Sequence, residues 1–327
     1  MSTAFLSQFQ VQRLGWALLH FLWQGTAIVI LYAMVRRLLA RSLSAQGRYV
    51  LACLALGTMV LAPLLTLLLI PHATGGPSWT ISVAETQRLL AGVVLLWLLG
   101  VLVFSIRLAG GWRFTARLRS ISNPVPAEWQ QTLGRIALRA GVKKAVRMLV
   151  SPLVEVPAVI GWLRPVILVP VEFLAGLPPG HITALLAHEF AHIRRHDYLA
   201  NILQGIAETV LFYHPAVWWI SEQIRAEREQ CCDDLAVAVR GDVLAYAQAL
   251  AELELRQPRR LKPVLAANGG SLVDRIRRLI EPSHAPGESL PGPAAALGHD
   301  TALARGRRSG DSPRRTNPGL RSAYCGS

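Results

Sequence analysis

The sequence predicts a mainly α-helical membrane protein, in which three N-terminal transmembrane helices precede a cytosolic α+β domain. Hydrophobic residues make up 52% of the 327 residues and charged residues only 17%, a balance shifted toward membrane proteins. The runs Leu14–Val35, Tyr49–Ile70 and Leu89–Ile106 contain no aspartate, glutamate, lysine or arginine. A helix needs about 20 apolar residues to cross a bilayer, so each run is a predicted span. The alternative, a core helix, rarely stays uncharged over such a length.

The arginines between these runs predict the orientation of the chain. The loop between the first two runs has arginines and no acid, and a second basic cluster follows the third run: Arg36, Arg37, Arg41 and Arg48, then Arg107, Arg113, Arg117 and Arg119. Positively charged loops stay in the cytoplasm. We therefore expect a multi-pass protein of the cell membrane with its N-terminus outside and all residues after Arg107 in the cytoplasm. In a membrane protein, a net charge of +14 indicates loops held on the cytoplasmic side, so no direct nucleic-acid binding is expected.

Composition divides the chain into a membrane region (1–115), a cytosolic domain (116–285) and a tail (286–327). From Pro291 on, the tail has six arginines, two aspartates and no apolar run, which is typical of disordered segments. The four cysteines provide no paired framework for a disulfide-rich secreted fold.

The cytosolic domain alternates helical and strand patterns. Apolar residues at helical spacing predict a helix within 123–142, and short β-branched runs broken by prolines predict two or three strands within 146–170. An edge strand there would hold a peptide or serve as a structural hairpin. One long helix is expected over 177–203 and another over 220–239. The apolar stretch 199–220 would enter the bilayer or pack beside the spans.

The stretch "LLAHEFAHIRRHD" contains the pattern His-Glu-x-x-His, formed by His188, Glu189 and His192. On a helix, this spacing directs two imidazoles at one zinc ion and places the glutamate beside the water that zinc activates. The pattern predicts a zinc-dependent peptidase with one zinc ion, in which Glu189 takes a proton from water and later delivers it to the leaving amine.

A catalytic zinc takes three protein ligands and leaves the fourth position to water. His196, one further turn along the same helix, is a poor third ligand because a straight helix does not fold three turns onto one metal. Glu229 of the next helix is the preferred candidate, with Glu222 and Glu227 as rivals; Glu227 is expected to pair with nearby arginines on a solvated face. Asp233, one turn after Glu229, can accept the free N–H of a ligand histidine.

Two further polar residues have more than one interpretation. Asp197, like His196, either supports the metal ligands from behind or lies at a helix end. His214 precedes Pro215, so it either marks a helix break or donates a hydrogen bond to the transition state.

Four motifs together resemble the BlaR/MecR-type membrane metallopeptidases, the signal transducers of beta-lactam resistance. They are "LLAHEFAHIRRHDYLANIL", "FYHPAVWWI", "IRAEREQCCDDLAV" and "VPAVIGWLRPVILVP", and the resemblance extends from Leu14 to Ile280. It implies a zincin-like domain with His188, His192 and Glu229 as ligands and Glu189 as general base. It also implies signalling by proteolysis of a cytosolic transcriptional repressor, of the chain itself, or of both.

Well-known members of that family continue into a further span and an extracellular sensor, which we do not find before Ser327, and no Ser-x-x-Lys acylation motif occurs. A separate sensor protein, or an altered remnant of a longer protein, is therefore expected. Two alternatives remain open. One is a quality-control or processing protease resembling the CAAX-type and heat-shock zinc endopeptidases. The other is a non-catalytic scaffold with structural zinc, for which Cys231 and Cys232 would be candidate ligands.

Overall fold

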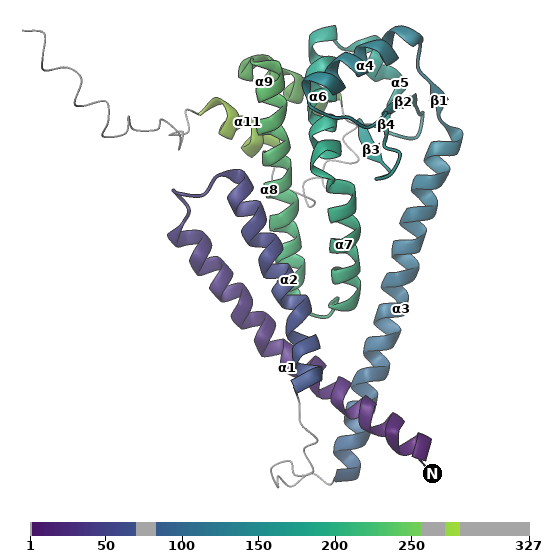
Figure 1. Cartoon of the computed structure of the whole chain (residues 1–327), viewed down its shortest axis with the longest axis vertical. Coiled ribbons are helices and arrows are strands. Elements are labelled where there is room, and N and C mark those ends of the chain that lie inside the picture. The colour runs from purple at the N-terminus through teal and green to yellow at the C-terminus, as the bar shows by residue number, and fades with distance from the viewer. Residues whose placement is uncertain (1, 70–82, 257–271, 282–327) are drawn as a thin grey trace, which may run out of the picture. The chain divides into compact units, whose positions relative to one another are not determined.

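The computed structural model describes residues 2–69, 83–256 and 272–281 (Figure 1). The chain divides into two compact units, Met1–His284 and Ala285–Ser327. The tail predicted for 286–327 lies outside the described residues, and the following description concerns the first unit alone.

Three long helices open the chain: α1 (Ser2–Leu38), α2 (Ala45–Leu69) and α3 (Val83–Ile121). The stretches Phe9–Leu38, Ala45–Leu69 and Ala84–Ile121 are long and apolar enough to cross a membrane. The three predicted apolar helices are confirmed, although each helix extends beyond its uncharged run. Helix α3 continues past residue 115, where the sequence placed the end of the membrane region.

A four-stranded sheet follows α3, and the helix α4 (Ala127–Arg139) lies between its first two strands in the sequence. The strands are β1 (Asn123–Pro124), β2 (Arg147–Val150), β3 (Ala158–Ile160) and β4 (Val166–Val169), in the spatial order β1-β2-β4-β3. Strand β4 runs parallel to β2 and antiparallel to β3. All four side chains of β4 are buried, whereas β3 forms an edge of the sheet. Strands β2 to β4 match the predicted strand region; β1 has only two residues, too few to produce a pattern.

The expectation of one continuous helix over 177–203 is wrong. After α5 (Val171–Gly176), helix α6 (Pro179–Arg195) ends at His196, which has the left-handed dihedrals φ 60° and ψ 34°. A second helix, α7 (Asp197–Val210), begins at the next residue. Asp197 therefore starts a new helix instead of continuing the surface of the first.

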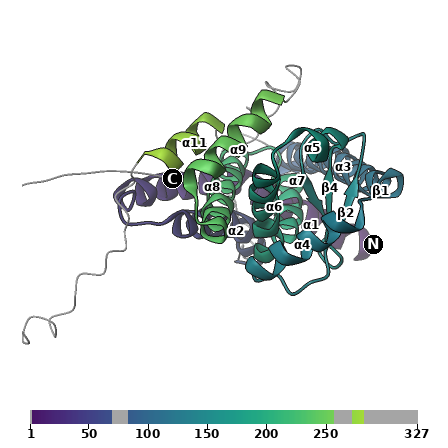
Figure 2. The same cartoon turned by 90° about the horizontal axis from the view of Figure 1, so that it is seen from above.

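The remaining helices are α8 (Pro215–Arg240), α9 (Val243–Arg256) and α11 (Leu272–Ile280). Helix α6 lies between the sheet on one side and α8 with α9 on the other (Figure 2). The core of this part is formed by side chains such as Leu133, Ile167, Phe190 and Tyr246.

A second core connects the N-terminal helices to α7 and α8 (Figure 1). It contains Phe21 of α1, Met59 of α2, Leu211, and Val217 and Ile220 of α8, all at most 1% exposed. Helix α8 therefore packs against the apolar N-terminal helices with its first half and against α6 with its second half.

Candidate metal centre

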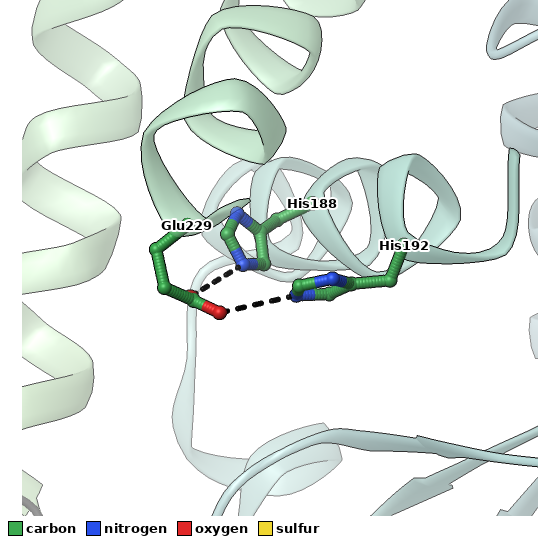
Figure 3. A group of neighbouring side chains, drawn as sticks. All are labelled: His188, His192 and Glu229. Atoms are coloured by element: carbon green, nitrogen blue, oxygen red, sulfur yellow. Dashed lines mark ion pairs between the residues drawn. The ribbon is translucent and has the colours of Figure 1, made fainter. Parts of the chain in front are cut away.

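The candidate centre lies where α6 and α8 pack together. His188 and His192 are one turn apart on α6, and Glu229 of α8 extends its carboxylate toward both (Figure 3). Glu229 Oε2 is 3.4 Å from His188 Nε2, and Glu229 Oε1 is 3.7 Å from His192 Nε2. One candidate ligand atom from each residue fits within a mutual distance of 4.8 Å.

This donor set fits a zinc ion. Zinc bonds to histidine nitrogen and carboxylate oxygen are about 2.0–2.2 Å long, so atoms at the corners of a tetrahedron around zinc lie about 3.3–3.6 Å apart. The two separations from Glu229, 3.4 Å and 3.7 Å, are close to that range. Two imidazoles and one carboxylate are also the ligands of one common type of catalytic zinc site.

The Nδ1 atom of His188, on the opposite side of the ring, contacts two buried polar residues. Asp233 Oδ1 lies 3.2 Å from it and the Tyr246 hydroxyl 2.9 Å from it. The same hydroxyl donates a hydrogen bond of 2.6 Å to Asp233. An acceptor on Nδ1 fixes the tautomer that leaves Nε2 free to bind a metal. Asp233 is thus placed as a support for His188.

Helix α11 contributes a cation that the sequence did not indicate. Arg275 binds Asp233 through two nitrogens, at 2.9 Å and 2.6 Å, and lies 3.3 Å from Glu229 Oε2. Tyr246 and Arg275 are separated from the motif by many residues, and neither belongs to a spacing pattern. Only the folded chain brings them to the centre.

The Nδ1 atom of His192 is supported by Asp197, whose Oδ2 lies 2.8 Å away. The helix break at His196 produces this contact, because it turns the first residue of α7 back toward α6. Cys232 donates to the same oxygen at 3.3 Å. Burial raises the pKa of the Cys232 thiol, and the nearby carboxylate of Asp197 raises it further, so the thiol stays protonated. These three groups are joined by hydrogen bonds, and their ligand atoms also lie close enough together to form a second possible metal site.

Glu189 is 9% exposed, directly follows His188 in the sequence and precedes His192 by three residues. Burial raises the pKa of its carboxyl group, while the neighbouring His192 and His188 oppose that shift. A carboxylate with a raised pKa accepts and releases a proton closer to neutral pH than an ordinary glutamate does.

The centre as a whole favours positive charge. Burial lowers the pKa of His188, but hydrogen bonds with Asp233 and Glu229 outweigh it and raise the pKa to about 9. Burial raises the pKa of Glu229, but His188, His192 and Arg275 outweigh it and hold this pKa below its usual value. A cation placed between the imidazoles and Glu229 therefore meets an ionised carboxylate.

A small pocket beside the centre is lined by residues of β3, the turn after β3, α6 and the start of α7. Its lining includes Val159, Gly161, Trp162, His192 and His196. The pocket thus lies between His192 and β3, which is an edge strand of the sheet.

Three predicted polar residues have other positions. His214 caps α8: its Nδ1 accepts from the Ala216 N–H at 3.1 Å, and its Nε2 lies 3.0 Å from the carbonyl oxygen of Leu22. Both ring nitrogens are engaged there, so the position of His214 favours the helix-break interpretation. Glu222 is exposed, and His196 occupies the helix break; neither belongs to the described cluster of ligand atoms.

Glu227 pairs with arginines, as predicted, but the prediction that it lies on a solvated face is wrong. It is 1% exposed and contacts Arg36 of α1 at 3.1 Å and Arg48 of α2 at 2.8 Å. Its partners therefore come from the end of α1 and the start of α2 and not from the neighbouring turns of α8.

Comparison with known proteins agrees with this architecture. The family model described as BlaR1 peptidase M56 matches residues 73–279. The regulatory protein BlaR1 of Bacillus licheniformis is 31% identical over 83 residues, which cover 25% of this chain and 14% of that protein. The methicillin resistance mecR1 protein of Staphylococcus aureus is 21% identical over 126 residues, covering 38% of this chain and 22% of that protein. The matched regions thus span less than a quarter of these relatives. Since the family model covers more than half of the sequence, the chain belongs to the BlaR1 peptidase M56 family.

Proposed function

We propose that the protein is a membrane zinc metalloendopeptidase that acts in signal transduction by cleaving a protein substrate. The observation that carries this proposal is the convergence of His188, His192 and Glu229 beside the buried carboxylate of Glu189. The family match supports peptidase activity, and the three apolar helices support a membrane location.

In this proposal His188, His192 and Glu229 hold one zinc ion through Nε2, Nε2 and the carboxylate. When bound, zinc supplies a Lewis acid and lowers the pKa of a water molecule. Glu189 accepts the proton of the attacking water and then delivers it to the nitrogen of the leaving amine. Asp233 and Asp197 keep the two imidazoles oriented by accepting from their Nδ1 atoms, at 3.2 Å and 2.8 Å.

The position of Cys231 and Cys232 argues against a structural zinc site. The Cys232 thiol donates a hydrogen bond to Asp197, on the side of the His192 ring that faces away from Glu229. Burial raises the pKa of the Cys231 thiol to about 11. Neither thiol belongs to the His188, His192 and Glu229 group. A structural site rich in cysteine would require thiolates at the metal.

The edge strand β3, the pocket beside His192 and the relatives support a protein substrate that is bound as an extended peptide. An extended peptide segment would pair with the edge strand β3 and pass His192. Since the relatives are named for regulation and methicillin resistance, we propose a cytosolic transcriptional repressor, the chain itself, or both as substrates. The arginine-rich loops favour an N-terminus outside the cell and a cytoplasmic metal centre, with a separate sensor as a candidate partner.

The test compares wild type with Glu189→Gln in membranes, each tagged at both ends, and uses Glu222→Gln as the matched control because Glu222 is exposed and outside the cluster. Fragments are followed by blotting, a candidate repressor is supplied, and zinc is measured on the same purified samples. We expect cleavage that a chelator abolishes in wild type and control, and full zinc content without cleavage in Glu189→Gln. Cleavage by a zinc-loaded Glu189→Gln variant, or a wild type that binds no zinc, would overturn the proposal.

A further inference from the structure

We propose that α7 and the first half of α8 form a re-entrant hairpin, which enters the bilayer beside the three apolar helices, turns near mid-depth and contacts lipid acyl chains. The hairpin comprises Asp197–Val210, a tip at Leu211–His214, and Pro215–Glu227. This inference concerns membrane insertion, goes beyond the proposed activity, and does not depend on the metal chemistry.

The depth of the tip is given by its contacts with two predicted spans. His214 Nε2 lies 3.0 Å from the carbonyl oxygen of Leu22, close to the centre of the uncharged run Leu14–Val35. The Trp97 indole donates at 2.9 Å to the carbonyl oxygen of Val210, and Trp97 is at the centre of the uncharged run Leu89–Ile106. Two helices that are separate in the sequence therefore place the tip at the middle of the apolar layer.

Aromatic packing holds the tip in the same place. The Phe212 ring stacks on Phe104 of α3 with centroids 5.2 Å apart, and a Cβ at Gly100 would overlap that ring. The Tyr213 hydroxyl donates at 3.1 Å to the carbonyl oxygen of Leu18 in α1. The glycine is thus required where the tip approaches α3 most closely.

The polar groups of the tip are satisfied inside the protein. The carbonyl oxygens of Val210 and Phe212 accept from the indoles of Trp97 and Trp218, at 2.9 Å and 2.8 Å, and the Ala216 N–H donates to His214. Helix ends in water leave such groups to the solvent. A turn in hydrocarbon must satisfy them with protein partners, which is the condition for non-helical backbone at membrane depth.

One ion pair, between Arg225 and Glu208, joins the two helices of the hairpin. Arg225 of α8 donates to Glu208 of α7 at 2.8 Å, and Gln204 donates to Glu208 and to the carbonyl oxygen of Ser221, at 3.2 Å and 2.9 Å. Ionisable groups within membranes are found paired in the protein interior. The polar sides of α7 and α8 therefore face each other.

The outward face of α7 is apolar. Leu203, Ile206 and Val210 are 60%, 45% and 38% exposed, and their spacing of three and four places them on one side of the helix. Leu95 and Leu102 of α3 are 69% and 56% exposed at the depth of the tip. Because this face continues the lipid-facing surface of a predicted span, its occupant is acyl chain.

The test introduces a small fluorescent amino acid by codon suppression at Leu203, Ile206 or Val210 of the full chain. Exposed Leu61 of α2 is the lipid-facing control, and exposed Leu138 of α4 is the water-facing control. Each sample is reconstituted into phosphatidylcholine vesicles that carry bromine near the headgroup or near the end of the acyl chain. Quenching by bromine and by aqueous iodide is then measured.

We expect Ile206 and Val210 to be quenched by acyl-chain bromine as Leu61 is, and to lose the iodide quenching seen at Leu138. Leu203 and Val210 are seven residues apart, about 10 Å along a helix, so Leu203 should respond more to shallow bromine and Val210 to deep bromine. Iodide quenching at Ile206 and Val210 would refute insertion. Protection from both quenchers would also refute the proposal, because protein and not lipid would then cover this face.

Discussion

Replacing Glu227 with glutamine removes the anion that connects α8 to the first two apolar helices. The carboxylate is 1% exposed, with Arg36 at 3.1 Å and Arg48 at 2.8 Å. Arg36 also donates to Gln223, and Arg48 donates at 2.7 Å to Gln230. Glutamine keeps the shape of the side chain but leaves two guanidinium groups without their counter-charge.

The cost follows from burial. Removing one partner of a buried ion pair destabilises a protein by about 3–5 kcal/mol. The side chains of Arg36 and Arg48 are 33% and 21% exposed, so water compensates part of that loss. We expect a loss of about 2–3 kcal/mol in the free energy of unfolding, or about 4–10 °C in melting temperature for a protein of this size.

The assay is thermal unfolding of the purified protein in detergent, with zinc present, against Glu222→Gln as the control. Glu222 is exposed on the same helix, so its substitution should change the free energy of unfolding by less than about 0.5 kcal/mol. Equal melting temperatures for the two variants would refute the reasoning. The contact would then be a surface pair, of the kind that contributes little.

Three further substitutions test other contacts. Asp233→Asn should weaken zinc binding about 10–100-fold in a chelator competition, because His188 loses its charged acceptor. The control Asp234→Asn, at a side chain that is 51% exposed, should leave zinc affinity unchanged. Equal zinc affinities of the two variants would contradict the role of Asp233 as a support for His188. His196→Gly should keep the zinc content and raise the free energy of unfolding by up to about 1 kcal/mol, because glycine adopts a φ of 60° without strain. Thermal unfolding measures this, and a loss of zinc would instead make His196 a ligand. Gly100→Ala should lower the free energy of unfolding by about 1–3 kcal/mol, since its Cβ would overlap the Phe212 ring. An unchanged melting temperature would mean that the tip does not pack there.

The sequence was most informative where a local pattern determines geometry. The uncharged runs required long apolar helices, and the spacing of His188 and His192 required both rings on one side of α6. The four-residue interval between Glu229 and Asp233 likewise placed both carboxylates on one face of α8, where they now contact His188.

The remaining features depend on contacts between distant segments. Nothing local marks His196 as a helix break, since neither glycine nor proline is present there. Arg275 reaches Asp233 from a helix 42 positions later, and the arginines that contact Glu227 belong to α1 and α2 and not to its own helix. The arginines that indicated topology thus also form buried pairs, a second role that charge counting does not detect.

The length of the hairpin sets the height of the metal centre above the bilayer. From Pro215, the first residue of α8, to Glu229, the helix rises by about 21 Å at 1.5 Å per residue, and half of the hydrocarbon layer is about 15 Å thick. For a tip at the midplane and an upright helix, the ligands lie about 6 Å above the hydrocarbon, at the level of the lipid headgroups. A bond to be cut must therefore be brought to the membrane surface. This geometry favours segments tethered close to the bilayer, including those of the chain itself, over sites in the interior of a folded soluble protein.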